Sequence, residues 1–258
     1  MKLSENAVEL ARRHNKVVFR DGDRVVKVFN DAKPSADIFN EALNGARVEA
    51  VGLPVPSVLE VSRIEGGEFD GSWALANRYI PGRTLYEAWC DDPDNINTYL
   101  ERLVDMQIKV QSVKAPLLNR QKDKLNRMIS QTKGIIDATT RYDLHMRLDG
   151  MRVEDCVCHG DFIASNIIVG DDGNLSVCDW AHVTAGIPEV DAAMTYMLFH
   201  IEHKDLAEPY LDLFCKKADV AKQLVFYWLP VVAAAELSRG RKKQEEFLKS
   251  WIYVYDYE

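Results

Sequence analysis

Two aspartates and one asparagine are the residues of this sequence that are best suited to catalysis or metal binding: Asp161, Asn166 and Asp179. Asn166 comes directly before the apolar run Ile167–Val169, and Asp179 comes at the end of the run that starts at Leu175. A tight Asp-Asp-Gly turn joins the two runs, so they should pair as an antiparallel hairpin in which the start of one strand opposes the end of the other. We therefore expect Asn166 and Asp179 to lie side by side.

This pair would form an oxygen-rich pocket of the kind that a hard divalent cation prefers. Mg²⁺ binds through few protein oxygens, together with waters and the phosphates of a substrate. Asp161 would lie at the rim of the pocket, where its carboxylate can accept a proton. An aspartate beside a hydroxyl, an asparagine and an aspartate on the metal, and a distant lysine on the phosphates are the groups that phosphoryl transfer requires.

Lys27 is the candidate for the distant lysine. It lies within the β-rich run Arg24–Phe29, where Val26 and Val28 should point to the opposite face of the strand. A strand lysine that faces a cleft needs an anionic partner. Glu41, near the start of the next expected helix, could hold the ammonium group and leave one N–H for a phosphate.

The elements before residue 80 are mainly strands. The β-rich runs Lys16–Arg20 and Arg24–Phe29 flank Asp21-Gly22, a strong hairpin signal. A helix over Asp37–Ala50 and further strands follow, near Val58–Val61 and over Trp73–Ile80.

Beyond Pro81-Gly82 the pattern becomes mainly helical. Apolar residues from Leu100 to Ile108 share one helical face, Lys122–Met151 is helical in pattern, and the chain from Leu198 onward is mostly helical. Strand and turn signals return only over Val153–Val177. The sequence thus predicts an α+β, two-lobed protein, with a β-rich lobe over residues 1–80 and a mainly helical lobe over residues 81–258.

The composition is that of an ordinary globular protein. Hydrophobic residues make up 47% and charged residues 28% of the 258 residues. The 32 Lys and Arg against 40 Asp and Glu give a net charge of −8. A negative surface repels phosphate backbones, so we expect no nucleic-acid partner, although a local basic patch stays open.

The pattern of apolar residues and cysteines predicts a cytoplasmic protein without a membrane partner. The longest strongly apolar run, Leu224–Ala235, spans 12 residues and contains Pro230, whereas a membrane span needs roughly 20. The N-terminal stretch lacks the apolar core of a signal peptide. The five cysteines form no C-x-x-C pair, so we expect free thiols in a reducing compartment.

One set of motifs resembles a known family. His159-Gly-Asp161, four residues, Asn166, then Asp179-Trp180 and the segment Gly186–Asp191 resemble the aminoglycoside phosphotransferase/choline kinase family. That family is a small-molecule branch of the protein-kinase-like fold. The resemblance extends from the hairpin that carries Lys27 to at least Asp191.

The resemblance implies roles for the residues singled out above. Asp161 would be the catalytic base, and Asn166 and Asp179 would bind Mg²⁺. Lys27 would contact the α- and β-phosphates of ATP and pair with Glu41. The first lobe would bind the nucleotide, and the second would hold the catalytic loop and the acceptor.

The resemblance also assigns a hinge and a supporting residue. The backbone of Arg78, Tyr79 and Ile80 would form the hinge and contact the adenine of ATP. Asp191 would support the catalytic loop by hydrogen bonds without taking part in the reaction.

Two departures from the family pattern matter. The loop expected to cover the phosphates, around Ala11–Lys16, contains no glycine, and glycine permits close approach of the backbone to a phosphate. Arg12, Arg13 or Lys16 could replace that contact with side-chain charge. The segment from Asp179 to Asp191 is short, which favours a small-molecule acceptor over a protein.

The prediction is an ATP-dependent phosphotransferase that moves the γ-phosphate to a hydroxyl of a small molecule, such as an amino sugar or amino alcohol. The alternatives are a nucleotide-binding pseudoenzyme that serves as an interaction module, favoured by the loop without glycine, and a protein kinase. The intact set of Asp161, Asn166 and Asp179 argues against the pseudoenzyme.

Overall fold

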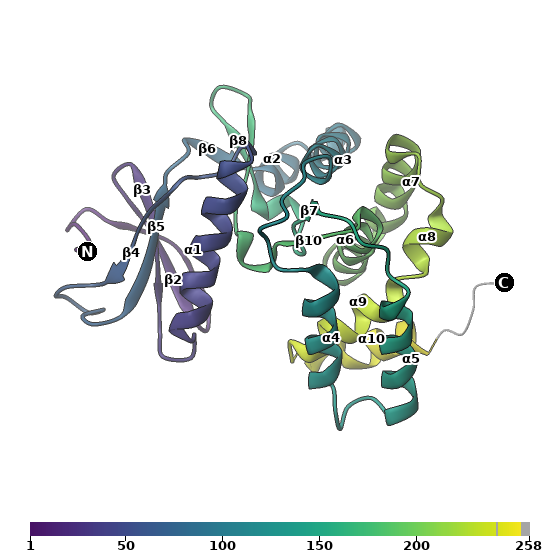
Figure 1. The fold of residues 1–258 in the computed structure, drawn as a ribbon. Helices are drawn as coiled ribbons and strands as arrows, with labels where there is room; N and C mark the ends of the chain where they lie inside the picture. The colour runs from purple at the N-terminus through teal and green to yellow at the C-terminus, as the bar shows by residue number, and fades with distance from the viewer. Residues whose placement is uncertain (241, 254–258) are drawn as a thin grey trace. The chain divides into compact units, whose positions relative to one another are not determined.

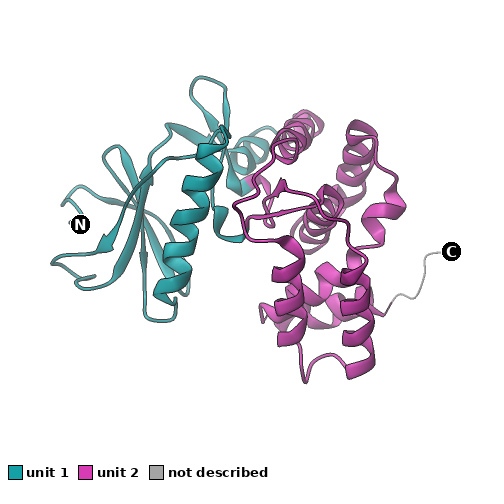
Figure 2. Cartoon of the chain, in the orientation of Figure 1, with its two compact units in different colours: residues 1–92, 165–182 teal, residues 93–164, 183–258 magenta. Residues whose placement is uncertain are grey.

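The structure of the chain, a computed structural model, describes residues 1–240 and 242–253 (Figure 1). The chain forms two compact units, which Figure 2 colours separately. The first contains Met1–Asp92 and Ser165–His182, and the second contains Pro93–Ala164 and Val183–Glu258.

This division differs from the boundary at residue 81 that the sequence pattern indicates, and β-pairing gives the reason. β6 (Gly82–Thr84) pairs with β8 (Ile167–Gly170), and β8 pairs with β9 (Leu175–Val177) in one sheet. The helix α2 (Leu85–Asp91) follows β6 directly. The sheet therefore draws residues 82–92 and the later hairpin into the first unit. The assignment of nucleotide binding to residues 1–80, and of the catalytic loop and acceptor site to residues 81–258, stays a prediction.

A five-stranded antiparallel sheet dominates the first unit. Its strand order is β1-β2-β3-β5-β4, and its strands are β1 (Val8–Arg12), β2 (Lys16–Asp21), β3 (Arg24–Phe29), β4 (Val58–Arg63) and β5 (Trp73–Arg78). The strands predicted from the sequence are all present. β1, which has mostly exposed residues, is an additional edge strand.

The predicted hairpin forms between β2 and β3. Asp21 pairs with Arg24, so the loop consists of Gly22 and Asp23. Gly22 has a φ of 66°, which suits the first central position of a type II′ turn, where glycine avoids a steric cost. The register places Lys27 opposite Val18.

The helix α1 (Ser35–Ala50) packs on one face of this sheet, through Ile38 and Ala42 against Phe29 and Leu75. The other face buries Val17, Phe19, Val26, Val28, Ala74 and Ala76. Lys27 therefore lies on the face that α1 covers, and Val26 and Val28 lie on the opposite face, as the strand alternation predicts.

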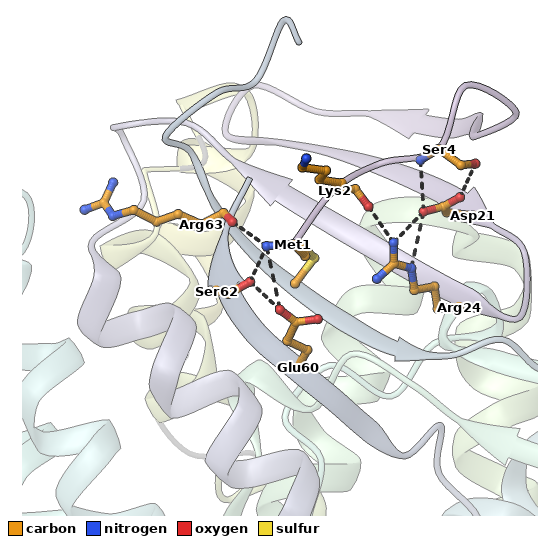
Figure 3. Close-up of polar contacts among 8 residues, drawn as sticks. All are labelled: Met1, Lys2, Ser4, Asp21, Arg24, Glu60, Ser62 and Arg63. Atoms are coloured by element: carbon orange, nitrogen blue, oxygen red, sulfur yellow. Dashed lines mark hydrogen bonds and ion pairs between the residues drawn. The ribbon is translucent and has the colours of Figure 1, made fainter. Parts of the chain in front are cut away.

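The N-terminal segment closes the face opposite α1 (Figure 3). The α-amino group of Met1 donates to the carbonyl of Arg63 at 2.6 Å and to the hydroxyl of Ser62 at 2.9 Å. Further along the segment, the Ser4 hydroxyl donates to Asp21, and the Arg24 guanidinium, which pairs with Asp21, donates to the Lys2 carbonyl at 2.6 Å. These contacts hold the segment against β4 and the hairpin of β2 and β3.

The second unit is mainly helical. Its helices are α3 (Ile96–Gln111), α4 (Gln121–Gln131), α5 (Ala138–Asp149), α6 (Pro188–Glu202), α7 (Ala207–Ala218), α8 (Lys222–Phe226), α9 (Leu229–Ser238) and α10 (Glu245–Ile252). β7 (Cys156–Cys158) and β10 (Thr184–Gly186) form a two-stranded sheet. Short 3₁₀ helices occur at Pro93–Asn95, Ala164–Asn166, Trp180–His182, Lys204–Leu206 and Lys242–Gln244.

One helical prediction needs correction. The helical pattern over Lys122–Met151 is two helices, because the chain breaks near Gly134, whose φ of 91° is outside the helical region. The described chain from Leu198 onward is mostly helical, and the helix that contains Leu198 starts at Pro188. Proline suits the first turn of a helix because its missing N–H would have no partner there. The α+β class itself is confirmed.

Among the described residues, no single helix is long and apolar enough to cross a membrane. Two consecutive helical segments would have the length and apolar composition of a membrane span only if taken together: Lys204–Ala218 and Lys222–Ser238. They are bent by 117° at the break between them. All five cysteines are free thiols.

Candidate active site

Lys27 and Glu41 form a close ion pair in the first unit. The Nζ of Lys27 lies 2.6 Å from Oε1 of Glu41, and only 4% of the Glu41 side chain is exposed. The strand alternation directs Lys27 toward α1, and Glu41 lies one helical turn after Ile38 on the buried side of that helix. The Lys27 ammonium group offsets the free-energy cost of burying the Glu41 carboxylate.

Asp179 lies at the end of the hairpin formed by β8 and β9. The Cys178 N–H donates to the carbonyl of Asn166 at 2.9 Å, which extends the pairing of Ile167 with Val177 by one residue. This places Asn166 opposite Cys178, the residue before Asp179. Asp179 has a φ of 62°, in the left-handed region, which aspartate tolerates better than most residues.

Two lysines contact the carboxylate of Asp179. The Nζ of Lys27 lies 3.3 Å from Oδ1, and the Nζ of Lys16 lies 3.2 Å from Oδ2. All three side chains are largely shielded from water. Each oxygen of the Asp179 carboxylate therefore already contacts a positively charged group.

The electrostatics keep Lys27 charged. Burial alone would lower the pKa of Lys27, but the carboxylates of Asp179 and Glu41 outweigh this effect and hold the pKa above its ordinary value. Lys27 is consequently a permanent cation at any physiological pH.

Further contacts hold the segment after Asp179. The Trp180 indole N–H donates to the carbonyl of Val177 at 2.8 Å, and the buried Asn44 of α1 donates to the Trp180 carbonyl at 3.4 Å. The Val177 N–H donates to the carbonyl of Pro54 at 2.9 Å. The hairpin is thus attached on both sides within the first unit.

The donor set fits Mg²⁺ better than a transition metal. In the part of the chain that the structure describes, no group of three or more His, Cys, Asp or Glu side chains could hold a metal by itself. One carboxylate from Asp179 and one carboxamide from Asn166 are hard oxygen donors. Mg²⁺ is commonly held by such a small set when substrate phosphates and waters complete its coordination.

The predicted hinge follows β5. The Arg78 N–H donates to the carbonyl of Ser57 at 2.9 Å, and the Tyr79 N–H donates to the carbonyl of Asp23 at 2.8 Å. The next N–H, that of Ile80, has no backbone acceptor among the described residues. A base that binds at this hinge would therefore meet the Ile80 N–H, while Arg78 and Tyr79 use theirs within the sheet.

The loop with Asp161 lies in the second unit. It follows β7, and Gly160 takes a φ of 76° that glycine adopts at no steric cost. The Asp161 N–H donates to Nδ1 of His159 at 3.2 Å, and His159 is fully buried. His159 therefore orders the loop.

Asp191 holds this loop from α6. Its Oδ1 accepts the Gly160 N–H at 2.7 Å, and its Oδ2 accepts the carboxamides of Gln111 at 2.9 Å and Gln107 at 3.4 Å. Gln107 also accepts a hydrogen bond from the hydroxyl of Tyr210 at 2.7 Å. The Asp191 carboxylate is buried and fully engaged, so its role in the second unit is to position the loop.

The sequence matches the phosphotransferase enzyme family over residues 8–224. The chain belongs to this family. No protein with a curated description matches the sequence.

Solved structures of phosphotransferases share the protein-kinase-like fold of the chain. Aminoglycoside phosphotransferase APH(4)-Ia has a TM-score of 0.70 at 16% identity, covering 96% of this chain and 92% of that chain. Choline kinase LicA from Streptococcus pneumoniae has a TM-score of 0.65 at 15% identity, covering 98% and 95%. A choline/ethanolamine kinase family protein from Mesorhizobium loti has a TM-score of 0.64 at 17% identity, covering 96% and 85%.

Membership in the phosphotransferase enzyme family confirms the resemblance found in the sequence and supports phosphoryl transfer to a small molecule. Within the first unit, the structure brings together Lys27, Glu41 and Asp179, with the Asn166 backbone paired beside Asp179. Asp161 lies in the second unit.

The sequence did not reveal a partly buried lysine near Asp161. Lys124 of α4 lies within electrostatic reach of Asp161, Asp191, Glu236 and Arg239, and the last two form an ion pair at 3.0 Å. Burial, and next the Arg239 guanidinium, lower the pKa of Lys124 to about 7, against the opposing effect of the three carboxylates.

Other contributing residues were also missed. Lys16 is one of three cations that the sequence offers near the loop, and the structure places it at Asp179. Gln107 and Gln111 interrupt the apolar face of α3 at a spacing of four residues. Two glutamines on a buried helical face are the signal that could have indicated a polar partner such as Asp191.

Proposed function

We propose that this phosphotransferase moves the γ-phosphate of ATP to a hydroxyl group of a small molecule, with Mg²⁺ as cofactor. The observation that carries the proposal is the charged cluster in the first unit. Lys27 pairs with Glu41, and each carboxylate oxygen of Asp179 contacts one lysine. Nothing in a purely structural role requires two lysines to be shielded beside one carboxylate.

In this proposal Lys27 binds the α- and β-phosphates of ATP. Glu41 accepts one N–H of its ammonium group and so orients the others, which is why a buried pair at 2.6 Å supports the role. Asn166 and Asp179 would hold Mg²⁺, which when bound neutralises charge on the phosphates. The Ile80 N–H would donate to the adenine at the hinge.

Asp161 is proposed as the base that accepts the proton of the acceptor hydroxyl. Its loop is held by Asp191 through the Gly160 N–H, so the carboxylate keeps a defined orientation. The remaining catalytic effect would come from positioning and from fixed positive charge, because phosphoryl transfer needs little covalent participation by the protein.

For the acceptor, we propose an amino sugar, an amino alcohol or a similar hydroxyl compound. APH(4)-Ia has been solved in ternary complexes with AMP-PNP or ADP and hygromycin B, which supports a nucleotide together with a small-molecule acceptor. The short segment from Asp179 to Asp191 argues against a protein kinase. The cytoplasmic location stays a prediction from the cysteine pattern.

An acceptor panel tests the proposal. Purified protein with Mg²⁺ and ATP is incubated with hydroxylated amines, amino sugars and polyols, and release of ADP is measured. We expect at least one acceptor to raise ADP release above the rate without acceptor, and the Asp161→Asn variant to abolish the difference.

The pseudoenzyme alternative predicts a different result. It requires that ATP raises the melting temperature while no acceptor in a broad panel stimulates ADP release. If neither ATP nor ADP stabilises the protein, with or without Mg²⁺, the proposal of an ATP-binding enzyme is wrong.

A further inference from the structure

The turn between β1 and β2 has the position of a phosphate-covering loop, but it contains no glycine. The Arg13 N–H donates to the carbonyl of Lys16 at 2.8 Å. The carbonyls of His14 and Asn15 accept hydrogen bonds from the Asn30 side chain and N–H at 2.8 and 3.2 Å. The Arg13 N–H is therefore already engaged, and without a glycine the backbone of the turn is poorly suited to approach a phosphate closely.

The cationic side chains near this turn are not equivalent. Arg12 donates to Glu9 through Nε at 3.0 Å and through NH2 at 2.6 Å, and more than half of its side chain is exposed. Lys16 is 21% exposed and contacts Asp179. Arg12 is therefore part of a surface pair, whereas Lys16 is directed at the proposed nucleotide site.

The register of the sheet explains why Lys16 reaches that site. Lys27 pairs with Val18 across the hairpin, and Lys16 is two residues before Val18 on the same strand. Side chains two residues apart point to the same face, so Lys16 and Lys27 are diagonal neighbours on one face. Both ammonium groups then meet the two oxygens of Asp179.

Within this cluster, Lys16 pairs with Asp179, and Lys27 pairs with both Asp179 and Glu41. Lys16 and Lys27 supply two positive charges, and Glu41 and Asp179 supply two negative charges. When Asp179 binds a divalent cation, Lys16 loses its partner, because Glu41 contacts Lys27. A partly shielded ammonium group then needs another anion, and the phosphates of the nucleotide are the anions that would enter with the metal.

We infer that Lys16 is a second phosphate-binding lysine, which replaces with side-chain charge the contact that a glycine-rich loop makes through its backbone. The inference rests on the proposed function and adds to it a residue of the nucleotide site. Lys16 pairs with Asp179 when no nucleotide is bound and with a phosphate of ATP or ADP when one is.

Calorimetric binding of ADP, ATP and adenosine tests the inference, with and without Mg²⁺. Loss of one charge-assisted hydrogen bond should weaken ADP and ATP binding to Lys16→Met by roughly tenfold or more. Adenosine binding should not change, because adenosine has no phosphate. Lys16→Arg should retain most of the affinity, and Arg12→Met should bind all three ligands like the wild type.

The outcomes separate this inference from the proposed function. If the wild type binds ADP and Lys16→Met binds it equally well, the inference is wrong and the proposed function stands. If Lys16→Met weakens adenosine as much as ADP, the side chain supports the fold of the site and does not bind phosphate, which also overturns the inference. If the wild type binds no nucleotide, both proposals fail together.

Discussion

At the scale of single residues, the site depends on charges whose partners are fixed by close contacts. Lys27 lies between Glu41 and Asp179, and Asp161 lies on a loop that Asp191 holds through the Gly160 N–H. Conservative substitutions therefore test chemistry with little effect on packing.

The substitution Asp161→Asn should abolish transfer and leave the fold intact. A carboxamide has nearly the same shape as the carboxylate but accepts a proton far less readily, so kcat should fall by about 10²-fold or more. Steady-state ADP release in the presence of an acceptor measures the effect. An unchanged melting temperature and unchanged ATP binding are the controls, and activity near that of the wild type would contradict the assignment of Asp161 as the base.

Lys124 should make stability depend on pH. The pKa of Lys124 is lowered to about 7 in the folded protein, while the unfolded chain keeps the proton until about pH 10.4. The unfolded state binds more protons between these values, so the free energy of unfolding should rise with pH there, by roughly 1 kcal/mol per pH unit.

Urea unfolding of the wild type and Lys124→Met at several pH values between 6 and about 10 checks this. The variant lacks the titrating group, so its curve should be flatter, and it should gain most over the wild type at the low end of this range. Parallel curves for the two proteins would show that Lys124 does not titrate abnormally.

At the scale of elements, short pairings decide where the functional hairpin lies. β6 pairs with β8, and Gly82 begins that pairing opposite Gly170. A Cβ at Gly82 would lie 2.1 Å from the carbonyl oxygen of Val169, and the φ of Gly82 is 141°. Only glycine permits so close an approach between the two strands.

The substitution Gly82→Ala should consequently destabilise the first unit by roughly 3 kcal/mol or more, because both the clash and the backbone strain must be relieved. Gly71→Ala is the matched control, since Gly71 also has a positive φ of 79° but no atom within 4 Å of its Cβ position. It should cost only about 1 kcal/mol. Equal losses in chemical denaturation would show that the close approach between β6 and β8 is unimportant.

At the scale of the whole molecule, nucleotide binding should be visible as stability. A ligand that binds only the folded state at 100 times its Kd adds about 2.7 kcal/mol. Mg²⁺ with ADP should therefore raise the melting temperature of the wild type by several degrees, since roughly 1 kcal/mol shifts a chain of this size by about 2–4 °C.

The Asp179→Asn variant should lose the part of this stabilisation that depends on Mg²⁺ and should have no transferase activity. Asparagine tolerates the left-handed backbone of Asp179, whose φ is 62°, so the variant should fold. The melting temperature with ADP alone and with ADP plus Mg²⁺ separates the two contributions. A wild-type response to Mg²⁺ in this variant would contradict Asp179 as a metal ligand.

Features formed by neighbours in sequence could be predicted without the structure. The hairpin of β8 and β9 is set by two apolar runs and a tight turn, so its existence and the pairing of its strands follow from local sequence. The pairing of Lys27 with Glu41 also follows, because strand and helix are consecutive and each has a defined buried face.

Tertiary packing decided the rest. Lys16 and Asp179 are 163 positions apart, Lys124 and Glu236 lie on separate helices, and Gln111 meets Asp191 from another helix. The periodicity of apolar residues indicates which face of a helix or strand is buried, but it does not indicate which element covers that face. The sequence by itself therefore determined the family, the α+β class and the local hairpin chemistry, whereas three-dimensional packing decided which charges surround the reacting groups, because long-range electrostatic partners leave no local pattern.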